Sequence, residues 1–315
     1  MKKYLGTAVV GIICLTLSIL GLVFNSPIEL SCVQIKTIII LGIVCGCSAL
    51  LCFTIGELTK NNSQMDKVWS ILPIIYCWII AGMGEMKPRL VIFAIIVTLW
   101  GIRLTFNFAR KGAYKLKFWQ GEEDYRWKVL RQNKILGKKP IWAVFDLFFI
   151  SGFQNGLVLM ICLPSFAAMN SYEPLNYIDI IATFFALFFL LYETIADEQQ
   201  MAFHTTKRQL LSTGLKLEEL PSPFNKGFNT TGLWAYSRHP NYFGEQMIWI
   251  SLYVFVIASK AVTYEVFSWT ILGPAMLVIL FLGSSAFQEG VSSSKYPEYK
   301  TYLEKVYKYI PFKKY

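Results

Sequence analysis

The densest group of side chains able to do chemistry lies in the segment N-T-T-G-L-W-A-Y-S-R-H-P-N-Y-F-G-E-Q, residues 229–246. Within eight positions it holds a guanidinium, an imidazole, an amide, a phenol and a carboxylate, on Arg238, His239, Asn241, Tyr242 and Glu245. Pro240 is typical of the first turn of a helix, where its missing N–H costs nothing. A helix N-terminus with an arginine beside it favours an anion such as phosphate. The pattern therefore predicts a ligand site at the start of a helix.

Anchoring in a membrane is the alternative interpretation of this segment. Arginine, tyrosine and tryptophan gather at the level of lipid headgroups, and an apolar run begins at Met247. Anchoring accounts for one or two of the five polar side chains but not for all five together. We therefore favour a ligand site.

A second polar face lies near the end of another apolar run. Arg103, Asn107 and Arg110 are spaced as i, i+4 and i+7, which places them on one face of a helix. An arginine at the depth of Arg103 costs about 2.5–3.5 kcal/mol in lipid and usually faces a cavity or an acid. We expect a ligand contact or an ion pair at Arg103, whereas Arg110 suits the lipid headgroups.

A third polar face carries two acids. Glu193 and Asp197 are one helical turn apart, and Lys207 and Arg208 follow further along. The acids suit ion pairs with the arginines named above and suit hydrogen bonds to ribose hydroxyls equally well, and the two cations suit phosphate. The spacing leaves both interpretations open.

The elements that must position these groups are membrane helices. Of 315 residues, 55% are hydrophobic and 16% are charged, which is too apolar for an ordinary soluble domain. Runs of about 20 apolar residues recur, long enough to cross the hydrocarbon layer, and backbone in lipid must be helical. We predict eight spans, near residues 5–24, 36–56, 68–84, 90–109, 141–168, 177–196, 246–262 and 266–287. The fifth is long and interrupted around Gly152 and Asn155, so we expect it to tilt or kink.

The net charge of +10 is concentrated in loops. Ten Lys or Arg lie between Arg110 and Lys139, and six lie between Lys295 and Lys314. The positive-inside rule then places residues 110–140, 197–243 and 288–315 in the cytosol, together with both termini. This placement disfavours nucleic acid as a partner and favours membrane lipids.

A metal site is disfavoured by the residues available. The two histidines, His204 and His239, have no cluster of acids and thiols around them. Six of the seven cysteines fall inside apolar spans, where free cysteine behaves as a small hydrophobe. We therefore expect no metal and no structural disulfide.

Five motifs in order carry a family resemblance: W-G-I-R-L at 100–104, E-D-Y-R-W at 123–127, E-T-I-A-D-E-Q-Q at 193–200, R-H-P-N-Y at 238–242 and S-K-Y-P-E-Y-K-T-Y at 294–302. The sequence resembles the DUF1295 branch of the membrane-bound steroid 5-alpha-reductase-like proteins over roughly residues 66–312, with residues 1–60 outside the strongest resemblance. We expect a single integral membrane domain over residues 1–315. The resemblance implies an all-α polytopic transmembrane helical bundle of about eight spans, in a bacterial cytoplasmic or endoplasmic reticulum membrane, with a cofactor cavity that faces the cytosol.

The resemblance also implies an activity, an NADPH-dependent reduction of a C=C bond in a sterol-like or other apolar lipid substrate. Carried over motif by motif, the cofactor contacts would be Arg103, Asn107, Asp197, Lys207, Arg238, His239, Asn241 and Glu245. Tyr242 or Asp66 would supply a proton as the catalytic acid. D-K-V-W-S at 66–70 resembles a typical stretch of the branch, which favours Asp66 over Tyr76.

Two other functions stay open at this point. Isoprenylcysteine carboxyl methyltransferases share a looser R-H-P-x-Y-x-G form, which implies S-adenosylmethionine as the cofactor and a lipidated or lipid substrate. Asn241 and the E-T-I-A-D-E-Q-Q motif favour the reductase. A non-catalytic lipid-binding membrane protein is the third class, and the dense polar cluster argues against it.

Overall fold

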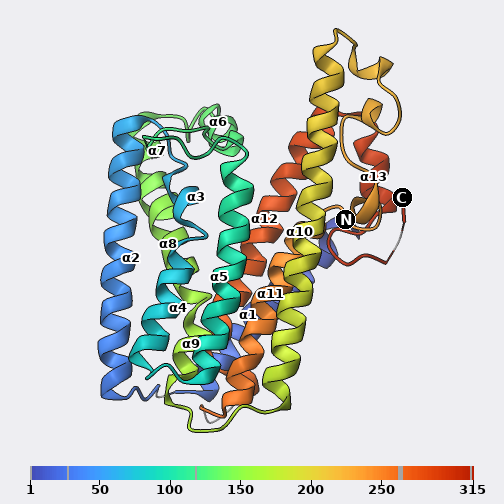
Figure 1. Ribbon diagram of the computed structural model, residues 1–315. Helices are drawn as coiled ribbons and strands as arrows, with labels where there is room; N and C mark the ends of the chain where they lie inside the picture. Colours follow the sequence, from blue (N-terminus) through green and yellow to red (C-terminus); the bar gives the residue numbers. More distant parts are fainter. Residues whose placement is uncertain (1, 27, 118, 262–264, 313) are drawn as a thin grey trace. The chain divides into compact units, whose positions relative to one another are not determined.

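The structure is a computed structural model that describes residues 2–26, 28–117, 119–261, 265–312 and 314–315. Over these ranges it is helical and contains no strand, which confirms the predicted all-α fold class. The helices are α1 (Lys2–Phe24), α2 (Cys32–Thr59), α3 (Gln64–Val68), α4 (Leu72–Met83), α5 (Pro88–Ala109), α6 (Tyr125–Arg131), α7 (Lys139–Phe145), α8 (Gln154–Met160), α9 (Leu163–Ala167), α10 (Tyr177–Ser212), α11 (Pro240–Ser259), α12 (Leu272–Lys295) and α13 (Tyr299–Lys305) (Figure 1). Short 3-10 turns occupy parts of the connections.

Each of the eight predicted spans coincides with helical structure. Within the described residues, six helical stretches are long and apolar enough to cross a membrane: Cys32–Thr59, Pro88–Ala109, Lys139–Met160, Tyr177–Ser212, Pro240–Ser259 and Trp269–Lys295. The apolar helices Ala8–Phe24 and Leu72–Met83 are shorter. The chain is therefore an integral membrane protein with six long candidate spans among the residues described, and the predicted count of eight is approximate. The end of the predicted seventh span and part of the loop after it, residues 262–264, lie outside the described residues.

The predicted irregularity of the fifth span is a π-helical segment, Asp146–Phe153, between α7 and α8. Gly152 fits its wider turn, because a Cβ atom there would lie 2.7 Å from the carbonyl oxygen of Leu147. The buried carboxylate of Asp146 accepts hydrogen bonds from Ser151 Oγ at 3.0 Å and from Asn62 Nδ2 at 2.6 Å. A single-turn π segment inside a helix is a common device at functional positions.

The helices group into two compact units. The first unit comprises Met1–Cys14, Phe184–Ser251 and Leu277–Tyr315, and the second comprises Leu15–Thr183 and Leu252–Met276. Four long helices, α1, α10, α11 and α12, contribute residues to both units.

In the second unit, α2, α4, α5 and α8 pack against one another (Figure 1). The core between them is apolar and closely packed, with Tyr76, Phe93 and Trp100 almost completely buried. Gly101 permits a close approach, because a Cβ atom there would lie 2.5 Å from the carbonyl oxygen of Ser70.

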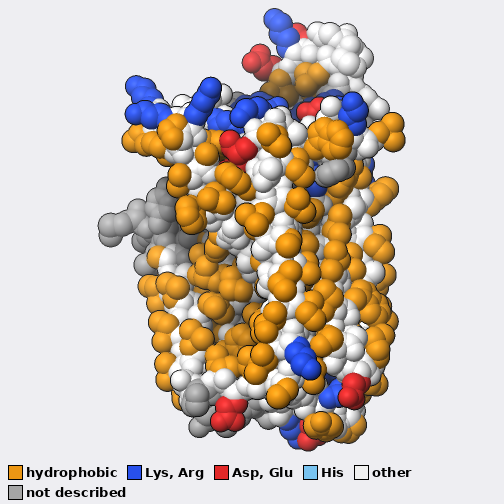
Figure 2. All heavy atoms as spheres, turned by 90° about the vertical axis from the view of Figure 1, so that its left-hand side faces the viewer, with side chains coloured by type: hydrophobic (Ala, Val, Ile, Leu, Met, Phe, Trp, Pro, Cys, Tyr) orange, Lys and Arg blue, Asp and Glu red, His pale blue; other side chains and the backbone are white. Residues whose placement is uncertain are grey.

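The outer face of α2 contacts membrane lipid. Large apolar side chains are exposed along the helix, among them Ile39, Ile43, Leu50, Leu51 and Leu58. Figure 2 shows hydrophobic side chains over this face and Lys and Arg side chains gathered at one end of it. A face of this kind is stable in a bilayer, where an exposed apolar surface costs nothing.

Loops that the eight-span prediction places on the same side of the membrane contact one another at the same end of the second unit. At one end, Ser31 Oγ donates to Asn170 Oδ1 at 3.1 Å and Lys87 Nζ donates to the Met169 carbonyl at 2.7 Å. At the other end, the 57–67 segment contacts the basic 110–131 segment, for example where Asp124 N donates to Ser63 Oγ at 2.9 Å. The compartment that each end faces stays a prediction.

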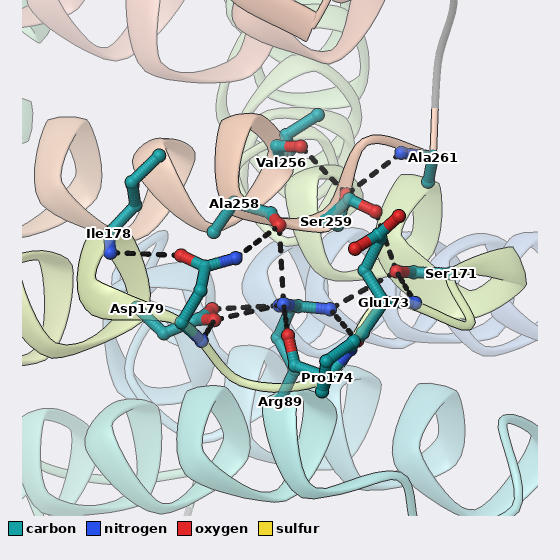
Figure 3. Close-up of polar contacts among 11 residues, drawn as sticks. Arg89, Ser171, Glu173, Pro174, Ile178, Asp179, Val256, Ala258, Ser259 and Ala261 are labelled. Atoms are coloured by element: carbon teal, nitrogen blue, oxygen red, sulfur yellow. Dashed lines mark hydrogen bonds and ion pairs between the residues drawn. The ribbon is translucent and has the colours of Figure 1, made fainter.

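Arg89 ties the first of these ends together (Figure 3). Its guanidinium pairs with both carboxylate oxygens of Asp179, at 2.7 and 2.9 Å. It also donates to Ser171 Oγ and to three backbone carbonyls, those of Glu173, Pro174 and Ala258. Both charged side chains are buried, and a fully hydrogen-bonded pair is what makes such burial tolerable.

The first unit holds the end of α10, residues 213–239, the start of α11, the end of α12 and α13. Its small core is aromatic: Phe228 packs on the rings of Tyr299 and Tyr302, with Val306 beside them. The phenol of Tyr302 donates to the Ser237 carbonyl at 3.2 Å and to that of Trp234. This core fixes the C-terminal tail, residues 299–312, against the segment that contains the predicted site.

Candidate functional site

The predicted site segment is docked on α10 in the first unit. Trp234 Nε1 donates to the Ala196 carbonyl at 2.9 Å, and the backbone N–H of Leu233 donates to Gln199 Oε1 at 2.8 Å. Gly232 has a φ of +58°, and a Cβ atom there would lie 2.4 Å from Gln199 Oε1. Glycine at 232 is thus required both by the backbone and by the close approach to α10.

The segment reaches α11 through a short extended contact with the tail. Ser237 and Tyr307 form a parallel bridge, in which Arg238 N donates to the Tyr307 carbonyl at 3.0 Å and His239 N to that of Lys308 at 3.0 Å. Pro240 is the first residue of α11, which confirms the predicted helix start. Arg238 and His239 therefore lie just outside the helix, as expected.

Arg238 is engaged by the protein itself. Its Nε lies 2.9 Å from Glu289 Oε1, and its Nη1 donates to the carbonyls of Leu303 at 2.6 Å and Val306 at 3.1 Å. Those carbonyls belong to the C-terminal end of α13, where an arginine satisfies groups that the helix leaves open. The side chain is only 8% exposed. Arg238 thus joins the tail to α12, a role that neither phosphate binding nor lipid anchoring anticipates.

His239 shares the same carboxylate. Its Nε2 lies 3.2 Å from Glu289 Oε1, and because a carboxylate only accepts, Nε2 carries the proton. Burial lowers the pKa of His239, while the hydrogen bond to Glu289 opposes that shift. Lys308 Nζ completes the group at 3.9 Å from Glu289 Oε2. The buried Glu289 is therefore surrounded by three donors.

Tyr242 lies one turn into α11 beside this group. Its ring stacks on the His239 imidazole, with centroids 5.4 Å apart and planes 16° apart, and packs on Phe281 at 4.4 Å. Its hydroxyl accepts a hydrogen bond from Gln288 Nε2. The phenol is therefore held in place, as a proton donor must be.

Asp197 and Asn241 form the second polar contact of the first unit. Asn241 Nδ2 donates to Asp197 Oδ1 at 3.1 Å, which joins the start of α11 to α10. Gly244 permits this close packing, since a Cβ atom there would lie 2.8 Å from the Cβ atom of Glu193. Further along, the buried Glu245 accepts a hydrogen bond from Trp249 Nε1 at 3.0 Å. A carboxylate and an amide side by side can both hold a sugar hydroxyl.

Lys207 binds the loop that contains Gly227 and does not face an open site. Its Nζ donates to the Gly227 carbonyl at 2.5 Å and lies 5.6 Å from the ring centroids of Phe203 and Tyr296. The side chain is buried, whereas its neighbour Arg208 is exposed and donates to the carbonyl of His204 in its own helix. Arg208 is therefore the residue of the two that solvent and ligands can reach.

Asp66 lies in the second unit, on α3. Its carboxylate accepts a hydrogen bond from Trp127 Nε1 at 3.0 Å, and Arg126 lies 3.6 Å away. Burial raises the pKa of Asp66, and the charge of Arg126 opposes this shift. The D-K-V-W-S stretch and the E-D-Y-R-W motif are thus brought together, a contact that their sequence positions do not reveal.

Arg103 and Asn107 also belong to the second unit, on α5. Arg110 donates to Asn107 Oδ1 at 3.0 Å from Nε and 2.8 Å from Nη2, as expected for residues on one helical face. Asn107 is buried and Arg103 is partly buried. The predicted participation of Asp66, Arg103 and Asn107 in one site with the residues of the first unit stays a prediction.

Among the described residues no group of three or more His, Cys, Asp and Glu side chains is placed to hold a metal ion. Glu289 was not identified from the sequence as the shared partner of Arg238 and His239. Its charge in the polar last third of an otherwise apolar helix is the signal that could have found it.

Comparison with known proteins identifies relatives over most of the chain. The family model described as "Protein of unknown function (DUF1295)" matches residues 52–306. An uncharacterized protein of the fission yeast Schizosaccharomyces pombe is 35% identical over 281 residues, which cover 83% of this chain and 78% of the yeast protein. No solved structure matches the chain. The motifs that meet in the first unit, the six long apolar spans and these matches agree, and the chain belongs to the DUF1295 family.

Proposed function

We propose that this protein is a membrane-embedded, NADPH-dependent reductase of a C=C bond in a sterol-like or other apolar lipid. The observation that carries the proposal is the contact between Asp197 and Asn241. It joins two motifs on which the resemblance to steroid 5-alpha-reductase-like proteins rests, E-T-I-A-D-E-Q-Q and R-H-P-N-Y. A buried carboxylate and a partly buried amide at the ends of two membrane helices would hold the ribose hydroxyls of a nucleotide.

The residues of the first unit fit the sugar part of NADPH better than its phosphates. The guanidinium of Arg238 pairs with Glu289 and donates to two backbone carbonyls, and the ammonium of Lys207 donates to the Gly227 carbonyl. Both cations are therefore turned toward groups of the protein itself. The exposed Arg208 on α10 would take the phosphate contact.

When bound, NADPH would supply the hydride for one carbon of the C=C bond. The other carbon needs a proton, and Tyr242 is the candidate donor in the first unit because its hydroxyl is fixed by Gln288. Asp66 is the candidate in the second unit, since burial raises its pKa and favours the protonated carboxyl. Replacing each acid separately, as Tyr242→Phe and Asp66→Asn, would identify the donor through the loss of turnover with cofactor binding retained.

Equilibrium binding to detergent-purified protein tests the proposal directly. We expect NADPH to bind and S-adenosylmethionine not to bind, and we expect Asn241→Leu to weaken NADPH binding. The lost hydrogen bonds are worth about 0.5–1.5 kcal/mol each, so the affinity should fall roughly 2- to 15-fold for each bond. Gln209→Leu, on the exposed surface of α10, is the matched control and should bind normally. Binding of S-adenosylmethionine alone would overturn the reductase and favour a methyltransferase.

A further inference from the structure

An open pocket of ≈ 430 Å³ lies in the second unit, where α2 ends. It is lined by Thr59, Asn61, Lys115, Trp119, Gln120 and Gly121. None of these residues has a part in the reaction proposed above. The pocket is large enough for a small polar group, such as the headgroup of a lipid.

One wall of the pocket is a loop whose backbone is held at several points. The loop closes where Glu122 N donates to the Gly112 carbonyl at 3.0 Å. Three successive carbonyls of the loop then accept hydrogen bonds from the α2–α3 junction: Trp119 from Gln64 Nε2 at 3.1 Å, Gln120 from Lys67 Nζ at 3.0 Å, and Gly121 from Asn61 Nδ2 at 3.1 Å. The pocket is thus a built feature of the fold.

Gly121 allows the loop to turn into this position. Its φ is +135°, and a Cβ atom there would lie 2.0 Å from the carbonyl oxygen of Ala113. Any other residue would open the loop and remove the wall. The carbonyls of residues 119–121 consequently hold the loop against the junction, and Lys115 and Trp119 line the pocket from this loop.

The pocket is positively charged. Lys115 is exposed, and no acidic side chain among the described residues pairs with it. Of the acids that follow in the chain, Glu123 is engaged with Arg131 and Asp124 with Arg126, and the exposed Glu122 does not line the pocket. A site with one unpaired ammonium and the side-chain amide of Gln120 beside it suits a phosphate.

The surroundings of the pocket are apolar and face lipid. Leu58, one residue from Thr59, is 78% exposed, and Leu116, next to Lys115, is completely exposed. Leu58 belongs to the apolar outer face of α2, and Figure 2 shows Lys and Arg side chains gathered at one end of that face. Apolar side chains directly beside an unpaired cation and a tryptophan match the boundary between acyl chains and headgroups.

We propose that this pocket binds the headgroup of an anionic phospholipid. The lipid phosphate would pair with Lys115, and the side-chain amide of Gln120 would contact the glycerol part of the headgroup. The acyl chains would lie along Leu58, Leu116 and the outer face of α2. The inference is independent of the reductase proposal, because it uses no residue of that site.

Native mass spectrometry of the full-length protein in detergent tests the proposal. The probes are dioleoyl phosphatidylglycerol, dioleoyl phosphatidylcholine and soluble glycerol phosphate, and the variants are Lys115→Gln, Lys115→Arg and Lys134→Gln. Lys134 is the matched control, an exposed lysine of the same basic segment that does not line the pocket. We expect the wild type to bind phosphatidylglycerol more tightly than phosphatidylcholine. Lys115→Gln should weaken phosphatidylglycerol binding about fivefold, since a lysine near an anionic lipid contributes about 1 kcal/mol.

Retained binding by Lys115→Arg and by Lys134→Gln would support the assignment. Equal losses in Lys115→Gln and Lys134→Gln would overturn it, because the effect would then be one of general charge. Glycerol phosphate binding as tightly as the lipid would overturn the lipid as the occupant. Displacement of the lipid by NADPH would also overturn it and would assign the pocket to the nucleotide.

Discussion

The replacement Arg238→Lys separates the structural role of Arg238 from a role in phosphate binding. Arginine reaches three acceptors at once from a planar fork, the Glu289 carboxylate and the carbonyls of Leu303 and Val306. Lysine keeps the charge but presents one compact ammonium on a flexible stem. It can stay with Glu289 or cap α13, but it cannot do both in the same geometry.

The expected cost follows from the contacts that are lost. At least one charge-assisted hydrogen bond to a buried carbonyl disappears, at about 1.5–3 kcal/mol. The side chain is 8% exposed, so water cannot replace the bond without opening the tail. A loss of this size corresponds to roughly a 10- to 150-fold increase in the population of the undocked tail.

Hydrogen exchange of the apo protein in detergent measures this population. The backbone N–H groups of Arg238 and His239, which donate to the tail, should lose protection by the same factor. Arg208→Lys is the control, since Arg208 is exposed and bonds only within its own helix. Unchanged protection in Arg238→Lys, together with weakened NADPH binding, would refute the structural role and restore Arg238 to the phosphate.

Three further outcomes follow from the same contacts. Burial lowers the folded-state pKa of His239 below its unfolded value of about 6.5, so on acidification His239 is protonated first in molecules whose tail is undocked. Protection of the tail from hydrogen exchange should therefore be full above about pH 6.5 and should fall as the pH drops below about 6.5. The variant His239→Gln should lose this pH dependence. Arg89→Met should lower the apparent melting temperature strongly, since an unpaired buried Asp179 costs about 3–5 kcal/mol, and Arg89→Met with Asp179→Leu should recover most of the loss. Gly232→Ala should destabilise the protein more than Gly214→Ala in thermal melts, because both glycines have positive φ but only the Cβ at 232 collides, with Gln199.

Hydropathy and local signals predicted the helices but could not predict their partners. Pro240 marks the start of α11 through a property of proline itself, and the spacing of Asn107 and Arg110 gives their contact on α5. Neighbours along a helix are fixed by its period, so one sequence is enough to find them. Lys207 and Arg208 show the limit, because a step of one residue turns the side chain by about 100°, and only the packing of Phe228 and the tail decides which of the two is buried.

The partner of Arg238 illustrates the same limit over a longer distance. Glu193 and Asp197 were candidate partners for the arginines under one of the two interpretations left open, whereas the acid beside Arg238 is Glu289 on α12. Glu289 is the partner of Arg238 because the aromatic core of the first unit holds the tail beside α12. The residues of that core are not regularly spaced in the sequence, so the sequence alone does not predict the pair. Within the first unit, Asp197 lies beside Asn241 and Glu289 beside Arg238, and identifying these pairs needed the tertiary structure.

The contacts of the R-H-P motif thus indicate a structural role for it. Arg238 caps α13 and pairs with α12, His239 shares that carboxylate and supports Tyr242, and Pro240 begins α11. These are tasks of a scaffold, and a reductase and a methyltransferase built on one fold would need them equally. The motif therefore says little about which cofactor binds. The information about chemistry lies instead in the residue after the proline, because Asn241 is the one that reaches the acid of α10.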